Sequence, residues 1–210
     1  MFIKPYDESD PKSIEEYASK LVGLSFSDVI YNVANNEYEY EALVDYYKSP
    51  YGKGSLGNLL ERLYFFYQPN SDPRADFPKA GVELKVTPYE YTKKGKLKAG
   101  ERLVLSMIPF DRPLEDNLME SKLIEKIQLM LLIFYLRDRE KLRTDYRIGY
   151  VNLFHLLSKE TKEDLEIIKD DYKKIVDKIK DGKAHELSEG DTLYLGACTK
   201  GATAKSSYRS

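Results

Sequence analysis

The sequence predicts a mixed α/β or α+β domain, and three patterns support that prediction. Apolar residues recur at helical spacing near the amino end of the chain and again over residues 161–180. Between these stretches, residues 82–87 alternate strictly between apolar and polar side chains, as a half-buried strand does. Helices, then strands, then a long helix are typical of a mixed central sheet flanked by helices.

The composition fits one globular domain, because 42% of the 210 residues are hydrophobic and 32% are charged. It excludes disordered, collagen-like and coiled-coil proteins. The single cysteine, Cys198, cannot form an internal disulfide, so we expect a protein of the reducing cytoplasm. No apolar run is long enough to span a membrane, and the start lacks the pattern of a secretion signal.

The charge balance excludes a strongly basic nucleic-acid coat protein but not a DNA enzyme, because the net charge is −2. An enzyme that holds cations beside phosphate carries its own carboxylates, so its basic residues must be sought locally. One local excess is the tail after residue 199, which has basic residues and no acid. The other surrounds the single acid Glu101 and consists of Lys93, Lys94, Lys96, Lys98 and Arg102.

The first part of the chain is predicted to be mainly helical. Ser13 and Glu16 have the spacing of a capping box, so a first helix should begin at Ser13. A short helix is expected over residues 27–33, followed by a Tyr-rich loop around a weak helix. A single apolar stripe then predicts a helix over residues 55–66.

The middle of the chain is predicted to form a strand hairpin. Residues 68–81 are rich in Pro, Asn, Asp and Gly and should be irregular. Pro88 is expected to end the strand over residues 82–87. After the basic turn, residues 102–108 should form the hairpin partner of that strand.

The second half is predicted to add inner strands and a long helix. The length and β-branched content of residues 127–136 allow a strand or a buried helix, and we favour a central strand. Residues 150–157 predict another strand. Residues 161–180 form the clearest helix, with Gly182 as its C′ residue. A last strand is expected over residues 192–198.

Asp76, Glu83 and Lys85 form the pattern best suited to chemistry. Glu83 and Lys85 project from one face of the predicted strand, and Asp76 precedes it in the irregular loop. Two carboxylates and the backbone carbonyl of Leu84 suit a hard cation such as Mg²⁺. Lys85 would orient or help deprotonate a water in phosphodiester hydrolysis. The solvent face of an ordinary amphipathic strand shows the same residue types, so both interpretations stay open.

Three longer stretches are more specific: KGSLGNLLE at 53–61, ADFPKAGVELKVTP at 75–88 and HELSEGDTLYLGACTKGA at 185–202. Together they resemble the MutH family of DNA endonucleases, and more closely its restriction-enzyme branch that cuts at GATC. The resemblance covers nearly the whole chain from about Ser13 and implies the PD-(D/E)xK nuclease core. Ala75 stands where the name of that core has Pro, which changes loop geometry rather than a ligand.

The resemblance also implies roles for single residues. Asp76 and Glu83 match the metal-binding acids, and Lys85 matches the catalytic lysine. Glu61 matches an acid on the preceding helix, beside the metal. Two further groups match DNA-binding positions. They are the loop residues Lys53 and Gly54, and, in the recognition segment over residues 186–205, Ser188, Glu189, Asp191, Thr199, Lys200 and Lys205. Polar residues are also common in solvated loops and hairpins, so an interpretation without DNA contacts stays open for them.

The function that the resemblance implies is the catalytic domain of a type II restriction endonuclease. It would hydrolyse double-stranded DNA at GATC with Mg²⁺ and leave a 5′-phosphate. Residues 13–66 would form its helical part, and residues 75–210 its sheet, long helix and recognition segment. Relatives usually continue into a second DNA-binding domain, which we expect the full-length protein to have. A palindromic site requires a homodimer on DNA or successive nicks.

Three alternatives stay open. A MutH-like mismatch-repair enzyme would nick only the unmethylated strand, after activation by a partner protein. A DNA-binding effector domain would bind without cleavage, although such copies typically lose an acid or the lysine that this chain keeps. An interaction domain without a role in nucleic-acid binding would fail to retain DNA even at low salt.

Overall fold

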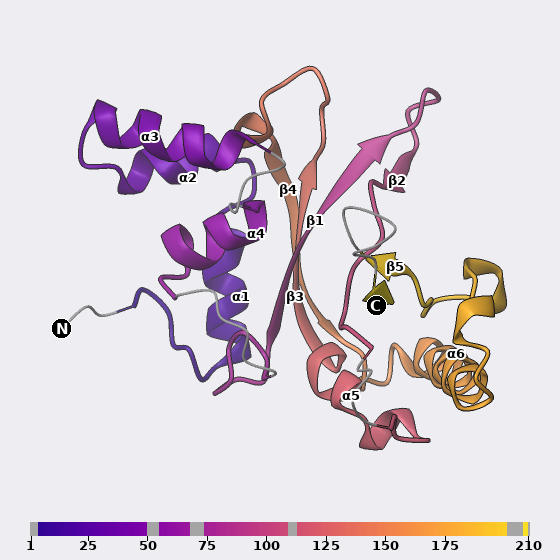
Figure 1. Cartoon of the computed structure of the whole chain (residues 1–210). Coiled ribbons are helices and arrows are strands. Elements are labelled where there is room, and N and C mark those ends of the chain that lie inside the picture. Colours follow the sequence, from indigo (N-terminus) through magenta and orange to yellow (C-terminus); the bar gives the residue numbers. More distant parts are fainter. Residues whose placement is uncertain (1–3, 50–54, 68–73, 109–112, 201–207, 210) are drawn as a thin grey trace. The chain divides into compact units, whose positions relative to one another are not determined.

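The computed structural model describes residues 4–49, 55–67, 74–108, 113–200 and 208–209 (Figure 1). It divides into two compact units. Unit 1 comprises Met1–Leu103 and Met130–Leu153, and unit 2 comprises Val104–Leu129 and Phe154–Ser210. Within the described ranges, no helix combines the length and the apolar character needed to cross a membrane. One catalytic domain over the whole chain stays a prediction.

Unit 1 begins with the predicted helical part. Its elements are α1 (Pro11–Ser19), α2 (Phe26–Val33), α3 (Glu37–Lys48), α4 (Leu56–Leu59) and the π-helical turn η1 (Leu60–Tyr64). The predicted start at Ser13 is wrong, because Asp10 caps α1 by accepting the Lys12 N–H. Ser13 instead accepts the backbone N–H of Asp7 at 3.0 Å. The Tyr-rich stretch forms a full helix of 12 residues, α3, which Asn36 caps.

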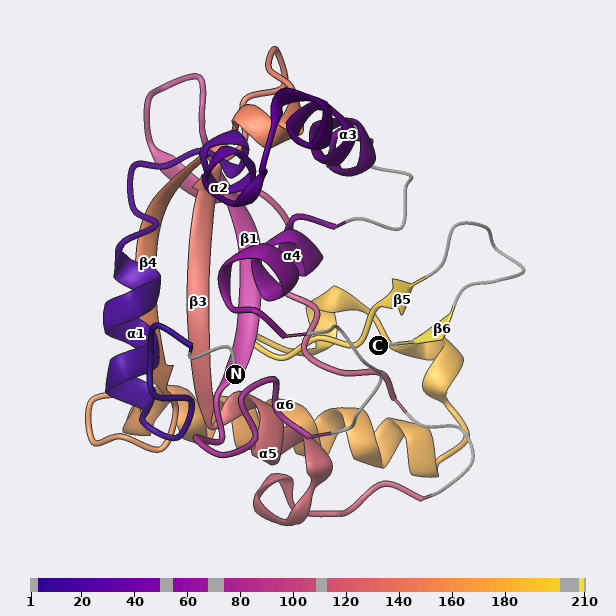
Figure 2. The same ribbon diagram turned by 90° about the vertical axis from the view of Figure 1, so that its left-hand side faces the viewer.

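A four-stranded mixed sheet in the order β2-β1-β3-β4 confirms the predicted fold class (Figures 1 and 2). The strands are β1 (Glu83–Tyr91), β2 (Leu97–Ala99), β3 (Leu129–Leu136) and β4 (Arg147–His155). β1 is antiparallel to β2 and parallel to β3. β3 therefore is the central strand expected over residues 127–136, and β4 begins three residues before the strand expected over residues 150–157.

The helices α1, α2 and α4 lie against one face of this sheet (Figure 2). These helices, the turn η1 and the strands contribute side chains that are fully buried: Ile14, Ala18, Phe26, Ile30, Leu59, Leu60, Leu131, Ile133 and Ile148. Complete burial of a large aliphatic or aromatic side chain stabilises the fold by about 1.5–3 kcal/mol. This core holds β1 in its place in the sheet.

Two predictions about the hairpin are wrong. β1 continues through Pro88, because the Pro88 carbonyl accepts the Gly100 N–H at 2.9 Å and therefore faces away from β3. The missing N–H of Pro88 thus costs no hydrogen bond to β3. The partner strand is Leu97–Ala99 rather than residues 102–108, because a tight turn between Thr92 and Lys96 reverses the chain early.

Unit 2 contains the predicted long helix as α6 (Lys162–Lys180), with Gly182 at φ +73° just beyond its end. Its other elements are η2 (Leu118–Glu120), α5 (Lys122–Ile127), η4 (Ala184–Glu186), η5 (Glu189–Asp191), β5 (Thr199–Lys200) and β6 (Tyr208–Arg209). The strand predicted over residues 192–198 is absent. Buried Asp171 of α6 accepts the N–H groups of Leu193, Tyr194 and Leu195, so these groups are not available to a sheet.

Candidate active site

The amino end of β1 carries Glu83 and Lys85 on one face, as the alternating sequence predicts. Glu83 is buried, with 3% of its surface exposed. The Lys85 ammonium donates to Oε1 of Glu83 at 2.8 Å. Because Glu83 is buried and Lys85 is half-buried, this ion pair is part of the site rather than a solvated surface pair.

Asp76 reaches the same end of β1 because the chain folds back just after it. Phe77 and Val82 form an antiparallel bridge, and Gly81 adopts the left-handed φ of +67° that this turn requires. Oδ2 of Asp76 then accepts the backbone N–H of Leu84 at 2.8 Å. The N–H and C=O of one strand residue point to the same side. The Leu84 carbonyl therefore lies on the edge of β1 that faces Asp76.

Glu61 comes from the π-helical turn η1, which continues α4. The wider turn is closed by the Phe65 N–H, which donates to the Leu60 carbonyl at 2.8 Å. Burial, followed by the negative charges of Asp76 and Glu83, raises the pKa of Glu61 to about 7 against the opposing effect of Lys85. The three predicted acids and the predicted lysine thus act on one another electrostatically. A single π turn inside a helix is frequent at functional sites.

An aromatic cluster holds these segments together. The rings of Phe65, after η1, and Phe77, next to Asp76, are both buried, with their centroids 5.3 Å apart. Tyr6 contacts both rings and donates its hydroxyl to the Phe65 carbonyl at 2.7 Å. Edge-to-face pairs of this kind add about 0.5–1.5 kcal/mol beyond the area they bury. The cluster therefore fixes the turn that carries Glu61 against the loop that carries Asp76.

Tyr67 is a neighbour of the site that the sequence analysis missed. Its hydroxyl is buried and has no hydrogen-bond partner within the described part of the chain. Burial and the charges of Asp76, Glu61 and Glu83 raise its pKa above the usual range. Its ring packs on Phe77 with the centroids 5.6 Å apart. No sequence signal distinguishes it, since it is one of 18 tyrosines.

The chemistry of these donors suits a divalent cation. Three carboxylates interact electrostatically at one partly buried site, and Lys85 forms an ion pair with one of them, Glu83. No three His, Cys, Asp or Glu side chains among the described residues are grouped closely enough to hold an ion by themselves. Asp76, Glu83 and the Leu84 carbonyl are oxygen donors of the kind that Mg²⁺ and Ca²⁺ prefer.

The predicted DNA contacts are placed less completely. Ser188 and Asp191 form a capping box over η5, and Asp191 also pairs with Lys178 of α6 at 2.8 Å. Lys178, followed by Ser188, lowers the pKa of Asp191 to about 2. Both side chains therefore order the recognition segment itself. The side chains of Glu189, Thr199 and Lys200, and the residues Lys53, Gly54 and Lys205 altogether, lie outside the described part of the structure.

Comparison with known proteins identifies the family. The profile of the family described as "DNA mismatch repair enzyme MutH" matches residues 65–171, about half of the chain. The chain is 39% identical over 154 residues to the type II restriction enzyme Sau3AI of Staphylococcus aureus. That match covers 73% of this chain but 31% of the enzyme, so the chain spans about a third of this relative.

A second relative is matched along more of its length. The chain is 26% identical over 195 residues to the DNA mismatch repair protein MutH of Vibrio campbellii (strain ATCC BAA-1116). This match covers 92% of the chain and 78% of that protein. The family profile includes the segment in which Asp76, Glu83 and Lys85 meet. The resemblance noted in the sequence is thus confirmed: the chain belongs to the MutH family of DNA endonucleases and has its PD-(D/E)xK nuclease fold.

Proposed function

We propose that the chain is the catalytic part of a type II restriction endonuclease that cuts double-stranded DNA at GATC with Mg²⁺. The observation that supports this most directly is the arrangement at the start of β1. Asp76 is bonded to the Leu84 N–H, and Glu83 holds Lys85, so that two acids, a carbonyl and an ammonium surround one position. The 39% identity to a type II restriction enzyme favours restriction over repair.

The reaction that fits this site is attack of a water on the scissile phosphate. The bond from phosphorus to the 3′ oxygen breaks, which leaves a 3′-hydroxyl and a 5′-phosphate. Asp76, Glu83 and the Leu84 carbonyl would hold the cation, which when bound supplies positive charge against the charge that develops on the phosphate.

The chain's own residues would do the remaining work. Lys85, oriented by Glu83, donates a hydrogen bond to the attacking water or to a phosphate oxygen. Glu61 has a pKa of about 7, so it can take up a proton near neutral pH. The Leu84 N–H, which donates to Oδ2 of Asp76, helps to keep this carboxylate in place.

A mismatch-repair nicking enzyme is the second candidate. The 26% identity to a DNA mismatch repair protein extends over 92% of the chain, and this coverage favours it. Such an enzyme would nick one strand of a hemimethylated site, whereas a restriction enzyme would cut both strands as a homodimer or by successive nicks. A binding domain without cleavage is disfavoured, because all four predicted catalytic side chains are present.

The test is digestion of a plasmid with GATC sites, unmethylated or adenine-methylated, by the chain with Mg²⁺. We expect discrete fragments that end at GATC and that disappear when the ion is chelated. Lys85→Ala should abolish cutting and retain DNA binding. Lys79→Ala, an exposed lysine in the same loop-and-strand segment, is the matched control and should cut normally.

Three outcomes would contradict the proposal. Cutting by Lys85→Ala at the normal rate would exclude the assigned mechanism. Nicks confined to the unmethylated strand of hemimethylated DNA would identify the repair enzyme. Binding to DNA at low salt without any cutting would identify the effector domain.

A further inference from the structure

The turn between β1 and β2 displays two lysines at its tip. The Gly95 N–H donates to the Thr92 carbonyl at 2.9 Å, and the Thr92 N–H donates to the Lys96 carbonyl at 2.8 Å. Lys93 and Lys94 therefore occupy the two central positions of this tight turn. Gly95 closes it at φ +73°, a conformation that glycine adopts without strain. The tip is thus a defined structure that holds two adjacent ammonium groups in solvent.

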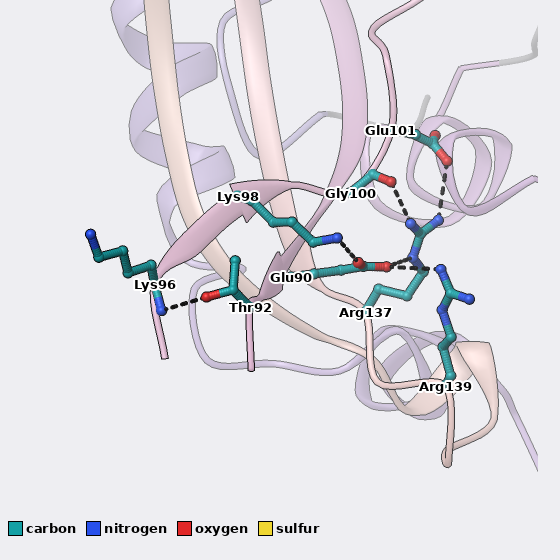
Figure 3. A network of polar contacts seen from close by, with 8 residues as sticks. All are labelled: Glu90, Thr92, Lys96, Lys98, Gly100, Glu101, Arg137 and Arg139. Atoms are coloured by element: carbon teal, nitrogen blue, oxygen red, sulfur yellow. Dashed lines mark hydrogen bonds and ion pairs between the residues drawn. The ribbon is translucent and has the colours of Figure 1, made fainter. Parts of the chain in front are cut away.

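These charges are not neutralised within the described part of the chain. Lys93, Lys94 and Lys96 are exposed, and none of them pairs with a described carboxylate. Figure 3 shows the Lys96 side chain pointing away from the polar network at the base of the turn. We call the segment from Tyr89 to Arg102 the basic hairpin.

The base of the basic hairpin is locked by one carboxylate that three cations share (Figure 3). Glu90 accepts from Arg137 Nε at 2.6 Å and pairs with Lys98 at 3.1 Å and with Arg139 at 3.4 Å. Arg137 also donates to the Gly100 carbonyl and to Glu101. Lys98 and Arg137 lower the pKa of Glu90 to about 2, so it stays charged. The two acids Glu90 and Glu101 face three cations in this network, so positive charge remains.

Protection of the sheet edge explains only part of this pattern. Lysines on an edge strand prevent pairing with other sheets, and Lys98 on β2 suits that role. Lys93 and Lys94 lie beyond Tyr91 and Leu97, the last paired residues of the ladder. Arg139 comes from a separate loop after β3. Together the basic hairpin and residues 137–141 have eight basic and four acidic residues, which is more charge than an edge needs.

We propose that the basic hairpin, together with Arg139, binds backbone phosphates of the duplex that flanks the cleavage site. This inference rests on the proposed nuclease function. A strand rises about 3.3 Å per residue, so the tip at Lys93 and Lys94 lies roughly 33–36 Å from Glu83 along the direction of β1. At about 3.4 Å per base pair, this is about ten base pairs away from the scissile phosphate for a duplex that runs along β1. The hairpin would therefore add affinity without sequence preference, beyond the four base pairs of GATC.

The test compares the full chain with the double variant Lys93→Ala/Lys94→Ala. The matched control is Lys12→Ala/Lys20→Ala, which removes two exposed charges from α1 and its end in the same unit. Binding is measured without divalent ions on duplexes of about 10 and about 30 base pairs centred on GATC. Each lysine that contacts a phosphate contributes about −0.9 to the slope of log affinity against log salt on B-DNA.

We expect the double variant to bind the long duplex about tenfold more weakly at low salt, with a slope shallower by about 1 to 2. Its affinity for the short duplex and its cleavage rate at saturating DNA should equal those of wild type. Lys93→Glu changes the charge of the tip by the same two units, so it should weaken binding to the long duplex about as much. Circular dichroism should show the same thermal midpoint for all variants, since both lysines are solvated.

Several results would overturn the inference. An unchanged salt slope on the long duplex, an equal loss in the control variant, or an equal loss on the short duplex would each do so. Selective binding of an acidic peptide by the wild type, with the duplex unaffected by the double variant, would make the hairpin a protein-binding surface instead. If the wild type neither binds nor cuts any duplex, the proposed function itself fails together with this inference.

Discussion

The two ends of strand β1 carry opposite charge arrangements. At its start, the carboxylates of Glu61, Asp76 and Glu83 lie near one another and near Lys85, and they are partly or fully buried. At its end, one carboxylate is shared by three cations, and the lysines beyond it are exposed. The local balance of charge, rather than the net charge of −2, therefore indicates which ligand each end suits. The start suits a cation and the end suits an anion.

Two glutamates make the contrast quantitative. Burial, together with neighbouring acids, raises the pKa of Glu61 to about 7. Hydrogen bonds to Lys98 and Arg137 lower the pKa of Glu90 to about 2. A glutamate can thus accept a proton near neutral pH at the start of the strand, whereas a glutamate at its end stays an anion.

The largest effect should come from removing one charge at the start of β1. Asp76→Asn keeps an oxygen that can accept the Leu84 N–H, so the turn should stay intact. The loss of a ligand charge should lower the rate of cutting by about a thousandfold or more, a loss comparable to removing one transition-state donor. Single-turnover digestion at saturating Mg²⁺ measures this.

A matched change at the other end sharpens the comparison. Glu90→Asn should leave the rate of single-turnover cutting within a few-fold of wild type, because Glu90 lies at the far end of the strand. Loss of cutting in both variants, or in neither, would show that the two ends do not have separate functions.

The second prediction concerns stability. Phe77 is 3% exposed and packs on Phe65, Tyr6 and Tyr67, so Phe77→Ala should lower the free energy of unfolding by about 3–5 kcal/mol. Tyr91, at the end of β1, is 53% exposed. Tyr91→Ala should change that free energy by about 0.5 kcal/mol or less. Urea unfolding followed by circular dichroism measures both free energies. Equal losses would show that core packing does not stabilise the start of β1 more than its end.

The start of β1, its acidic end, was largely predictable from sequence, because its arrangement depends on residues that are close together in the chain. Strict alternation over residues 82–87 places Glu83 and Lys85 on one face, whatever the strand pairs with. The bond from Asp76 to Leu84 needs only the short turn that Gly81 allows. The contribution of Tyr67 depends on burial against Phe77, which no local pattern encodes.

The basic end was predicted less well, because its structure depends on distant partners. β2 has only exposed residues, so it lacks the alternation that would reveal a strand. A proline commonly ends a strand, but the Pro88 carbonyl accepts the Gly100 N–H, a contact that the sequence around Pro88 does not reveal. In unit 2, the strand expected over residues 192–198 was lost to a carboxylate on α6, more than 20 residues earlier in the chain.

A third prediction tests whether the charge network orders the basic hairpin. Glu90→Gln removes the anion that Lys98, Arg137 and Arg139 share. Amide hydrogens of Thr92, Gly95 and Gly100 should then exchange with solvent severalfold faster. Glu101→Gln is the control, because Glu101 is exposed and pairs with Arg137 only at 3.4 Å, and it should change these rates less. Unchanged exchange in Glu90→Gln would mean that the turn alone orders the hairpin.

The smallest effect concerns a carboxylate that backbone groups, rather than cations, hold in unit 2. Burial opposes the charge of Asp171, but the N–H groups of Leu195, Tyr194 and Leu193 overcome it and lower its pKa. A lowered pKa in the folded state stabilises the protein above the usual Asp range near 4, and this stabilisation is lost as the pH falls below it.

Amides of residues 193–195 should therefore lose protection from hydrogen exchange on acidification, ahead of the α6 helix amides. Because the main partners of Asp171 are backbone dipoles inside the fold, with Lys174 a smaller contribution, 0.5 M salt should change this pH dependence little. The ordering of the basic hairpin by Glu90, which depends on partly exposed ion pairs, should weaken in the same salt. If salt shifted both equally, cations would have to stabilise the two carboxylates alike, and the contrast between backbone and side-chain partners would be wrong.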